Sequence, residues 1–140
     1  RNYIFGLRPG ILADRQLDQA LRRLAAELEE KAGVVTVAEV DPQAAAELAS
    51  RAGEVVQLAR EALSNVGRHA QATTCRLSLY RDGDQVVLEV DDDGRGFDPA
   101  RPGGGQGLGN LRERASALGG RVEISSQPGA GTRVLVVMPH

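Results

Sequence analysis

Residues 75–93 read CRLSLYRDGDQVVLEVDDD, and this stretch decides the class of fold. Apolar and polar residues alternate on both sides of Asp82-Gly83, which is the pattern of two half-buried strands joined by a tight turn. The second of these strands runs directly into the acidic triplet Asp91-Asp92-Asp93. The stretch therefore predicts a β-hairpin that ends in a group of carboxylates.

Two helical patterns precede this hairpin. Apolar residues at three- and four-residue spacing predict a first helix that Asp14 caps and Gly33 stops. A longer helical pattern covers residues 44–69, and Gly53 is expected to weaken it or to divide it in two. A short strand over residues 35–40 is expected between the two helices.

A third helix and a second hairpin are expected after the acidic triplet. The helix covers residues 108–118 and is closed by Gly119-Gly120. Residues 122–125 and 133–138 predict the two strands of the hairpin, which enclose a glycine-containing turn. This order of elements predicts an α+β fold, a two-layer sandwich in which a mixed sheet carries its helices on one face.

The composition limits the functions that this chain can perform. Its 17 basic and 19 acidic side chains give a net charge of -2, so we expect no nucleic acid partner. No run approaches the roughly 18 apolar residues of a membrane span. The single cysteine cannot form an internal disulfide, and two histidines offer few ligands for a zinc site. We therefore expect one domain of 140 residues in the cytoplasm.

Four polar residues stand out in the long helical pattern. Glu61, Asn65, Arg68 and His69 lie at i, i+4, i+7 and i+8, so a regular helix would present them on nearly one face. An acid, an amide, a guanidinium and an imidazole suit magnesium binding and phosphate neutralisation. Taken alone, the same residues are better explained by a solvated helix face.

Two glycine-containing segments follow. In the first, residues 92–97 (DDGRGF), a carboxylate at a strand end can accept a hydrogen bond from an exocyclic amine, while Gly94 and Gly96 leave room for a flat ring. In the second, residues 103–110 (GGGQGLGN), glycines lead into a helix start whose free amides can bind phosphates. It lacks the Gly-Lys-Ser/Thr of a Walker loop and the preceding βαβ strand of a Rossmann turn. Each segment alone supports no more than a loop.

Together and in this order, these segments resemble the GHKL superfamily of ATPases and kinases. Residues 61–70 (EALSNVGRHA) look like its N box, residues 92–96 (DDGRG) like its first glycine box, and residues 105–110 (GQGLGN) like its second. Residues 128–132 (PGAGT) add the Gly-x-Gly-Thr motif of the last hairpin. Gly67 and Asp93 depart mildly from the usual pattern.

Within that superfamily the chain most resembles the catalytic ATP-binding domain of NarL-type two-component sensor histidine kinases. The form of the N box, the short segment between Phe97 and Gly107 and the lead-in YIFGLRP over residues 3–9 carry this resemblance. It implies the GHKL (Bergerat) sandwich, with residues 1–13 as the tail of an upstream dimerisation helix and a linker. Residues 14–140 would form the ATP-binding catalytic domain.

The resemblance also implies a role for each polar segment. Asn65 would coordinate Mg²⁺, and Asp92 would bind the adenine amino group of ATP, directly and through a water that Thr132 helps to hold. Glu61 would polarise the attacking histidine, or it would lie next to the groups that coordinate the magnesium ion. The other nucleotide-binding residues would contact the base, the ribose or the phosphates: Arg68, His69, Gly94, Gly96, Phe97, Gly105, Gly107, Leu108 and Gly109.

The implied activity is transfer of the γ-phosphate of MgATP to a histidine on the upstream dimerisation domain. The parent protein would be a homodimer that passes the phosphate to a response regulator, and any membrane anchor would lie upstream of Arg1. The isolated domain would be a monomer that does not phosphorylate itself. Three alternatives stay open: another GHKL enzyme such as an anti-sigma-factor serine kinase, a non-catalytic nucleotide-sensing module, or a purely structural domain.

Overall fold

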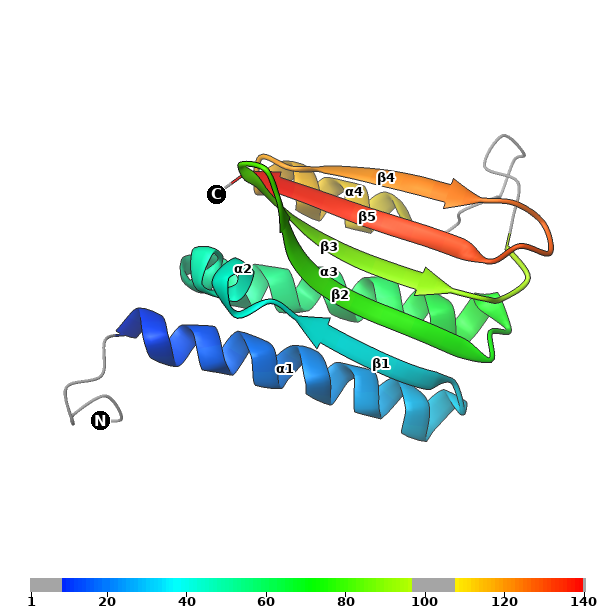
Figure 1. The fold of residues 1–140 in the computed structure, drawn as a ribbon. Helices are drawn as coiled ribbons and strands as arrows, with labels where there is room; N and C mark the ends of the chain where they lie inside the picture. The colour runs from blue at the N-terminus through cyan, green and yellow to red at the C-terminus, as the bar shows by residue number, and fades with distance from the viewer. Residues whose placement is uncertain (1–8, 97–107, 140) are drawn as a thin grey trace.

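The computed structural model describes residues 9–96 and 108–139 (Figure 1). The elements follow in this order: α1 (Pro9–Ala32), β1 (Val35–Val40), α2 (Pro42–Glu47), a 3₁₀ turn (Ala49–Arg51), α3 (Ala52–Asn65), a π-helical turn (Val66–Ala70), β2 (Thr74–Asp82), β3 (Gln85–Asp92), α4 (Leu108–Ala117), β4 (Arg121–Ser126) and β5 (Thr132–Pro139).

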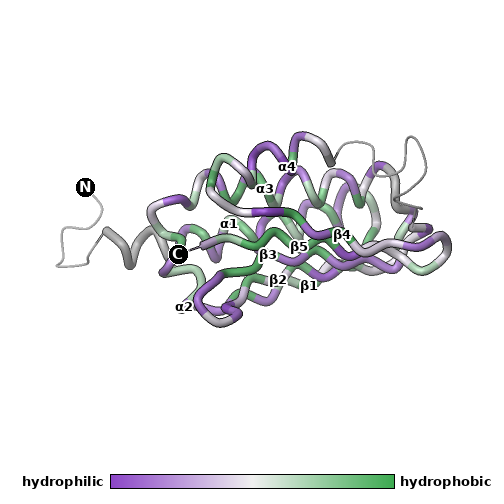
Figure 2. Tube along the Cα trace, turned by 90° about the horizontal axis from the view of Figure 1, so that it is seen from above, coloured by the Kyte–Doolittle hydropathy of each residue, from purple (hydrophilic) through white to green (hydrophobic). Residues whose placement is uncertain are grey.

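The five strands form one mixed sheet in the order β1-β2-β3-β5-β4. Strand β1 pairs in parallel with β2, and the other three pairings are antiparallel. Helices α1, α3 and α4 lie on one side of this sheet (Figure 2). The expected α+β two-layer sandwich is therefore confirmed, including the hairpin of residues 75–93.

The core lies between the sheet and these helices. Strand alternation sends every second residue of β2 and β3 towards the helices, and these residues are almost fully buried: Cys75, Leu77, Leu79, Val86, Leu88 and Val90. The helices contribute leucines of α1 and the apolar stripe of α3, of which Leu58 is fully buried. Burial of these side chains fixes α3 on the strands that lead to the acidic triplet.

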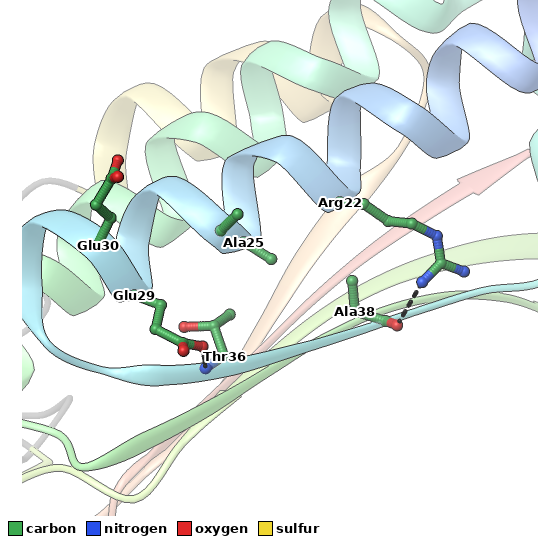
Figure 3. Close-up of a pocket in the computed structure, with 7 residues that line it drawn as sticks. Arg22, Ala25, Glu29, Glu30, Thr36 and Ala38 are labelled. Carbon is green, nitrogen blue, oxygen red and sulfur yellow. Dashed lines mark hydrogen bonds between the residues drawn. The ribbon is translucent and has the colours of Figure 1, made fainter.

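Strand β1 is an edge of the sheet, and two side chains of α1 bind its free backbone groups (Figure 3). The amide of Thr36 donates to the carboxylate of Glu29 at 3.0 Å, and Arg22 donates to the carbonyl of Ala38 at 3.1 Å. These bonds replace part of the ladder that a further strand would make. They attach α1 to the sheet along the edge.

Two expected helix boundaries are wrong. Helix α1 begins at Pro9, so Asp14 lies inside it instead of capping it; proline suits a first helical turn because its φ is fixed and it has no N–H. The long helical pattern is divided before Gly53, at Leu48. Leu48 leaves the helical region with φ −104° and ψ 11° while its side chain is fully buried, and this buried corner turns the chain.

The end of the long helical pattern also differs from a regular helix. Residues Val66–Ala70 form a π-helical turn, after which Gln71 has a φ of 52°. A π turn contains more residues than an α turn, so the expected i, i+7 and i+8 positions no longer stack on Glu61.

No helix in the described ranges has both the length and the apolar character needed to cross a bilayer.

Candidate functional site

Four elements meet at one end of the sandwich. Helix α3 and strand β3 both end there, and strand β5 and helix α4 both begin there (Figure 1). Three expected site residues are the terminal residues of these elements: Asn65 of α3, Asp92 of β3 and Thr132 of β5. The fold therefore brings the N-box segment and the first glycine segment to the same end of the molecule.

Asp92 is a buried carboxylate at the end of a core strand, with only 8% of its surface exposed. Its Oδ1 accepts a hydrogen bond from the amide of Gly94 at 2.8 Å, which closes a turn directly after the strand. Burial raises the pKa of Asp92, and the backbone N–H groups of Gly94 and Thr132 partly oppose this rise. Such a buried acceptor suits a neutral donor such as an amino group.

Asp93 has a different environment although it is the next residue. Its carboxylate is exposed, and Oδ1 accepts hydrogen bonds from the amides of Thr73 and Thr74 at 2.8 and 2.9 Å. These backbone donors lower the pKa of Asp93. Asp93 therefore ties the end of β3 to the start of β2, and the acceptor oxygen of an asparagine could make the same bonds.

The buried thiol opposite Asp92 is not a nucleophile. Cys75 of β2 pairs with Asp92 across the hairpin and is 3% exposed. Burial, together with the negative charges of the acidic triplet, raises the pKa of Cys75 to about 12. The thiol stays protonated at neutral pH, and it is inert because only the thiolate is reactive.

The loop after Asp92 packs against the turn between β4 and β5. Gly96 has a φ of 66°, and a Cβ atom there would collide with the carbonyl of Gln127. Gly131 has a φ of 79°, and a Cβ atom there would collide with the carbonyl of Asp92. The space beside Gly96 is thus filled by backbone, whereas the sequence suggested that it admits a flat ring.

A hydroxyl pair supports the start of β5. The Oγ atom of Ser126 lies 2.9 Å from Oγ1 of Thr132, and Ser126 also donates to the carbonyl of Gly131 at 3.1 Å. Ser126 is 9% exposed and was not among the expected site residues. The sequence pattern could have indicated its burial, because alternation along β4 places Ser126 on the same face as Val122 and Ile124.

Asn65 has an unusual environment for a polar side chain. Both Oδ1 and Nδ2 of its carboxamide are buried, and neither has a hydrogen-bond partner among the residues that the structure describes. A buried polar group without a partner costs free energy, so it indicates a missing ligand or neighbour. One helical turn earlier, Glu61 Oε1 accepts from Nε of Arg114 on α4 at 2.5 Å.

Arg68 does not share the side of α3 that carries Glu61. It is exposed and lines a groove of about 390 Å³ between α1 and α3, together with Leu24, Lys31 and Leu63. Helix α3 contacts α1 on one flank and α4 on the other, so Arg68 and Glu61 face different neighbours. Arg68 therefore departs from the expected single polar face, on which Glu61 and Asn65 remain one α-helical turn apart, and the π turn lies between Asn65 and the residues that follow it.

Several expected residues can be placed only in part or not at all. Gly109 lies exposed in the first turn of α4, and no atom of the described residues lies near the position of a Cβ there. The backbone of Leu108 begins α4, and the backbone of His69 lies in the π turn. Three further residues lie outside the described ranges: Phe97, Gly105 and Gly107.

The described residues contain no group of three or more His, Cys, Asp or Glu side chains that could hold a metal ion by themselves. A carboxamide oxygen without a partner is a ligand of the kind that Mg²⁺ uses when phosphate oxygens and waters complete its coordination. The residues present therefore fit an ion that arrives with a phosphorylated substrate.

Comparison with known proteins identifies the family. Residues 51–140 match the family described as histidine kinase-, DNA gyrase B-, and HSP90-like ATPase. Over the full length of this chain, the sequence is 37% identical to the signal transduction histidine-protein kinase/phosphatase UhpB of Salmonella typhimurium. The match covers 28% of that protein. The sequence is 30% identical to the sensor protein VraS of Staphylococcus aureus over 99% of this chain and 40% of that protein.

Solved structures show the same fold. The histidine kinase domain of a blue-light activated histidine kinase from Erythrobacter litoralis superposes with a TM-score of 0.68 and 23% identity, covering 88% of this chain and 60% of that one. The chain spans well under half of the curated relatives named above. By sequence, it belongs to the histidine kinase-, DNA gyrase B- and HSP90-like ATPase family, and its fold is the one seen in that solved histidine kinase domain.

Proposed function

We propose that this chain binds MgATP across Asp92 and Asn65 and presents the γ-phosphate to a histidine of the dimerisation domain of its parent sensor kinase. The observation that carries the proposal is the pairing of a buried acceptor with a buried carboxamide that lacks a partner among the described residues, at one end of a sandwich of this family. The family match supports ATP as the substrate.

Asp92 would bind the adenine end of the substrate. Its carboxylate is fixed by the amide of Gly94 and lies on the core side of β3, in register with Thr132 on β5. The hydroxyl of Thr132 is within hydrogen-bond distance of Ser126, so it is oriented beside the carboxylate. This arrangement favours the exocyclic amine of adenine over the carbonyl oxygen of guanine, because a carboxylate only accepts.

Asn65 would hold the magnesium end through its Oδ1. An ion held there would supply charge neutralisation for the phosphates. The chain itself positions the triphosphate and leaves the γ-phosphate accessible. Phosphoryl transfer of this kind needs little covalent chemistry from the protein, since alignment and charge stabilisation account for most of the acceleration.

The phosphate acceptor would come from another part of the parent protein. His69 belongs to the π turn that follows Asn65, and there it would contact the nucleotide and not accept the phosphate. UhpB and VraS are longer than this chain and are named as a histidine-protein kinase/phosphatase and a sensor protein. We therefore assign to the parent protein an upstream dimerisation domain with the acceptor histidine, a homodimeric state and a response regulator as the next acceptor.

The experiment uses the parent protein and γ-labelled ATP with magnesium. Acid-labile, base-stable label on a histidine outside residues 1–140 is the expected result. Acid-stable label on a serine of a partner protein would favour the serine-kinase alternative. ATP binding with no transfer by the parent protein would favour a nucleotide-sensing module, and absence of ATP binding would contradict the proposal altogether.

A further inference from the structure

Helices α3 and α4 are joined by an ion pair that the sequence resemblance does not assign. Nε of Arg114 on α4 lies 2.5 Å from Oε1 of Glu61 on α3. The Glu61 side chain is 22% exposed, whereas that of Arg114 is 48% exposed. The pair therefore lies at the rim of the helix layer, with its carboxylate on the sheltered side.

Both partners stand on backbone that the core holds in place. On α4, Leu111 and Ala115 are fully buried, and Arg114 lies between them in sequence. On α3, Ala62 directly follows Glu61 and is 3% exposed. A second hydrogen bond links the start of α3 to the end of α4. Arg51, which directly precedes α3, donates to the carbonyl of Leu118, which directly follows α4, at 2.9 Å. The ion pair thus connects two elements whose main chains are already fixed.

The position of the pair relates it to the nucleotide site. Glu61 precedes Asn65 by one helical turn on the same side of α3, and α4 begins at Leu108 where the second glycine segment enters it. Arg114 therefore joins the helix that carries the buried carboxamide of Asn65 to the helix whose first amides would face the phosphates. With Oε1 already accepting from Arg114, Glu61 has one carboxylate oxygen fewer to offer a reacting imidazole.

We propose that Arg114 is a positioning residue of the MgATP site, which holds Glu61 so that α3 presents Asn65 in a fixed relation to the start of α4. The inference rests on the proposed function, because it assigns a role within the same site. In this role the Glu61–Arg114 pair holds α3 and α4 together. The resemblance instead gave Glu61 the role of polarising the attacking histidine.

The test compares ATP affinity with magnesium and with a chelator, measured by calorimetry, in the protein and its variants. Arg114→Ala should reduce the gain in affinity that magnesium provides by about threefold to tenfold, the effect of losing a partly sheltered charge-assisted contact. Arg114→Lys should lose less, because it keeps the charge. Arg112→Ala is the matched control: Arg112 is on the same helix, exposed, and 3.4 Å from the carbonyl of Val122.

The decisive variant exchanges the charges, with Glu61→Arg and Arg114→Glu in one protein. An ion pair can form with its two charges in either order, so the exchange should restore the magnesium effect to within about twofold of the wild type. An Arg114→Ala protein with the wild-type magnesium effect would overturn the proposal, and so would an exchanged protein that binds as poorly as Arg114→Ala. If Arg114→Ala does not fold, Arg114→Lys and the exchanged protein distinguish the same two outcomes. Wild-type protein that binds no MgATP would instead contradict the proposed function itself.

Discussion

Asp92 stands directly opposite Thr132 across β3 and β5, with its carboxylate buried and one oxygen bound to the amide of Gly94. This relationship places an acceptor of fixed orientation beside a hydroxyl that Ser126 orients in turn. Both groups take part in hydrogen bonds within the fold. A ligand that presents an amine, together with a bound water, would meet the carboxylate and the hydroxyl already in position. This lowers the entropic cost of binding.

Asp92→Asn should weaken ATP binding by about 1–3 kcal/mol, because the amide is a weaker acceptor than the carboxylate and brings a donor that faces the adenine amine. Calorimetric titration of the variant with MgATP measures the loss. Thr36→Ser on the distant edge strand serves as a control, since it keeps the backbone bond to Glu29. Unchanged affinity in Asp92→Asn would exclude Asp92 as the adenine acceptor.

The two neighbouring aspartates should affect acid stability with opposite signs. Burial raises the pKa of Asp92, so its contribution to stability is full below its ordinary pKa of 3.8 and is lost as the pH rises through the raised value. Backbone donors lower the pKa of Asp93, so its contribution is present above 3.8 and is lost as the pH falls through the lowered value.

Denaturant unfolding from acid to neutral pH checks these signs. Relative to wild type, Asp92→Asn should gain stability as the pH rises past 3.8, whereas Asp93→Asn should lose stability over the same change. The same trend with pH in both variants would show that one of the two environments is assigned wrongly.

Asn65→Ala should abolish most of the magnesium-dependent gain in ATP affinity while leaving the free energy of unfolding unchanged to within about 1 kcal/mol. The fold is spared because the carboxamide makes no hydrogen bond to any described residue. Asn65→Asp keeps an oxygen ligand at the same place and should retain the magnesium effect. The metal assignment fails if Asn65→Ala responds to magnesium as the wild type does.

Gly131→Ala should destabilise the fold by more than about 1 kcal/mol, because the new Cβ would meet the carbonyl of Asp92 and the φ of 79° disfavours alanine. Gly53→Ala is the matched control: Gly53 lies in α3, and no atom in the described part of the chain lies near its Cβ position, so the change should stabilise by about 0.5–1 kcal/mol. Unfolding in urea measures both. Equal effects of the two substitutions would contradict the close packing of Gly131 on Asp92.

Local patterns predicted the sheet well. Alternation around Asp82-Gly83 predicted the central hairpin, and the segments over residues 35–40 and 133–138 were found as β1 and most of β5. The reason is that a half-buried strand has a period of two, which short segments already reveal. The same local signals placed Asp92 at the end of its strand and Asn65 in the last turns of its helical pattern, and the fold brings the ends of α3 and β3 to one end of the molecule.

Long-range contacts explain what the sequence did not reveal. The pattern over residues 44–69 is continuous, yet the buried side chain of Leu48 turns the chain before Gly53. Glu61 and Arg114 are 53 residues apart, so no local pattern connects them. The packing of Gly96 was not predicted for the same reason, because the turn that fills the space at its Cβ position lies on another hairpin.

The most direct test is a crystal structure of the protein with adenylyl imidodiphosphate and Mn²⁺, whose anomalous signal locates the ion. The account predicts one nucleotide whose exocyclic amine lies within hydrogen-bond distance of the Asp92 carboxylate, with the manganese ion bound by Oδ1 of Asn65. A nucleotide bound elsewhere, or an ion that Asn65 does not contact, would contradict it.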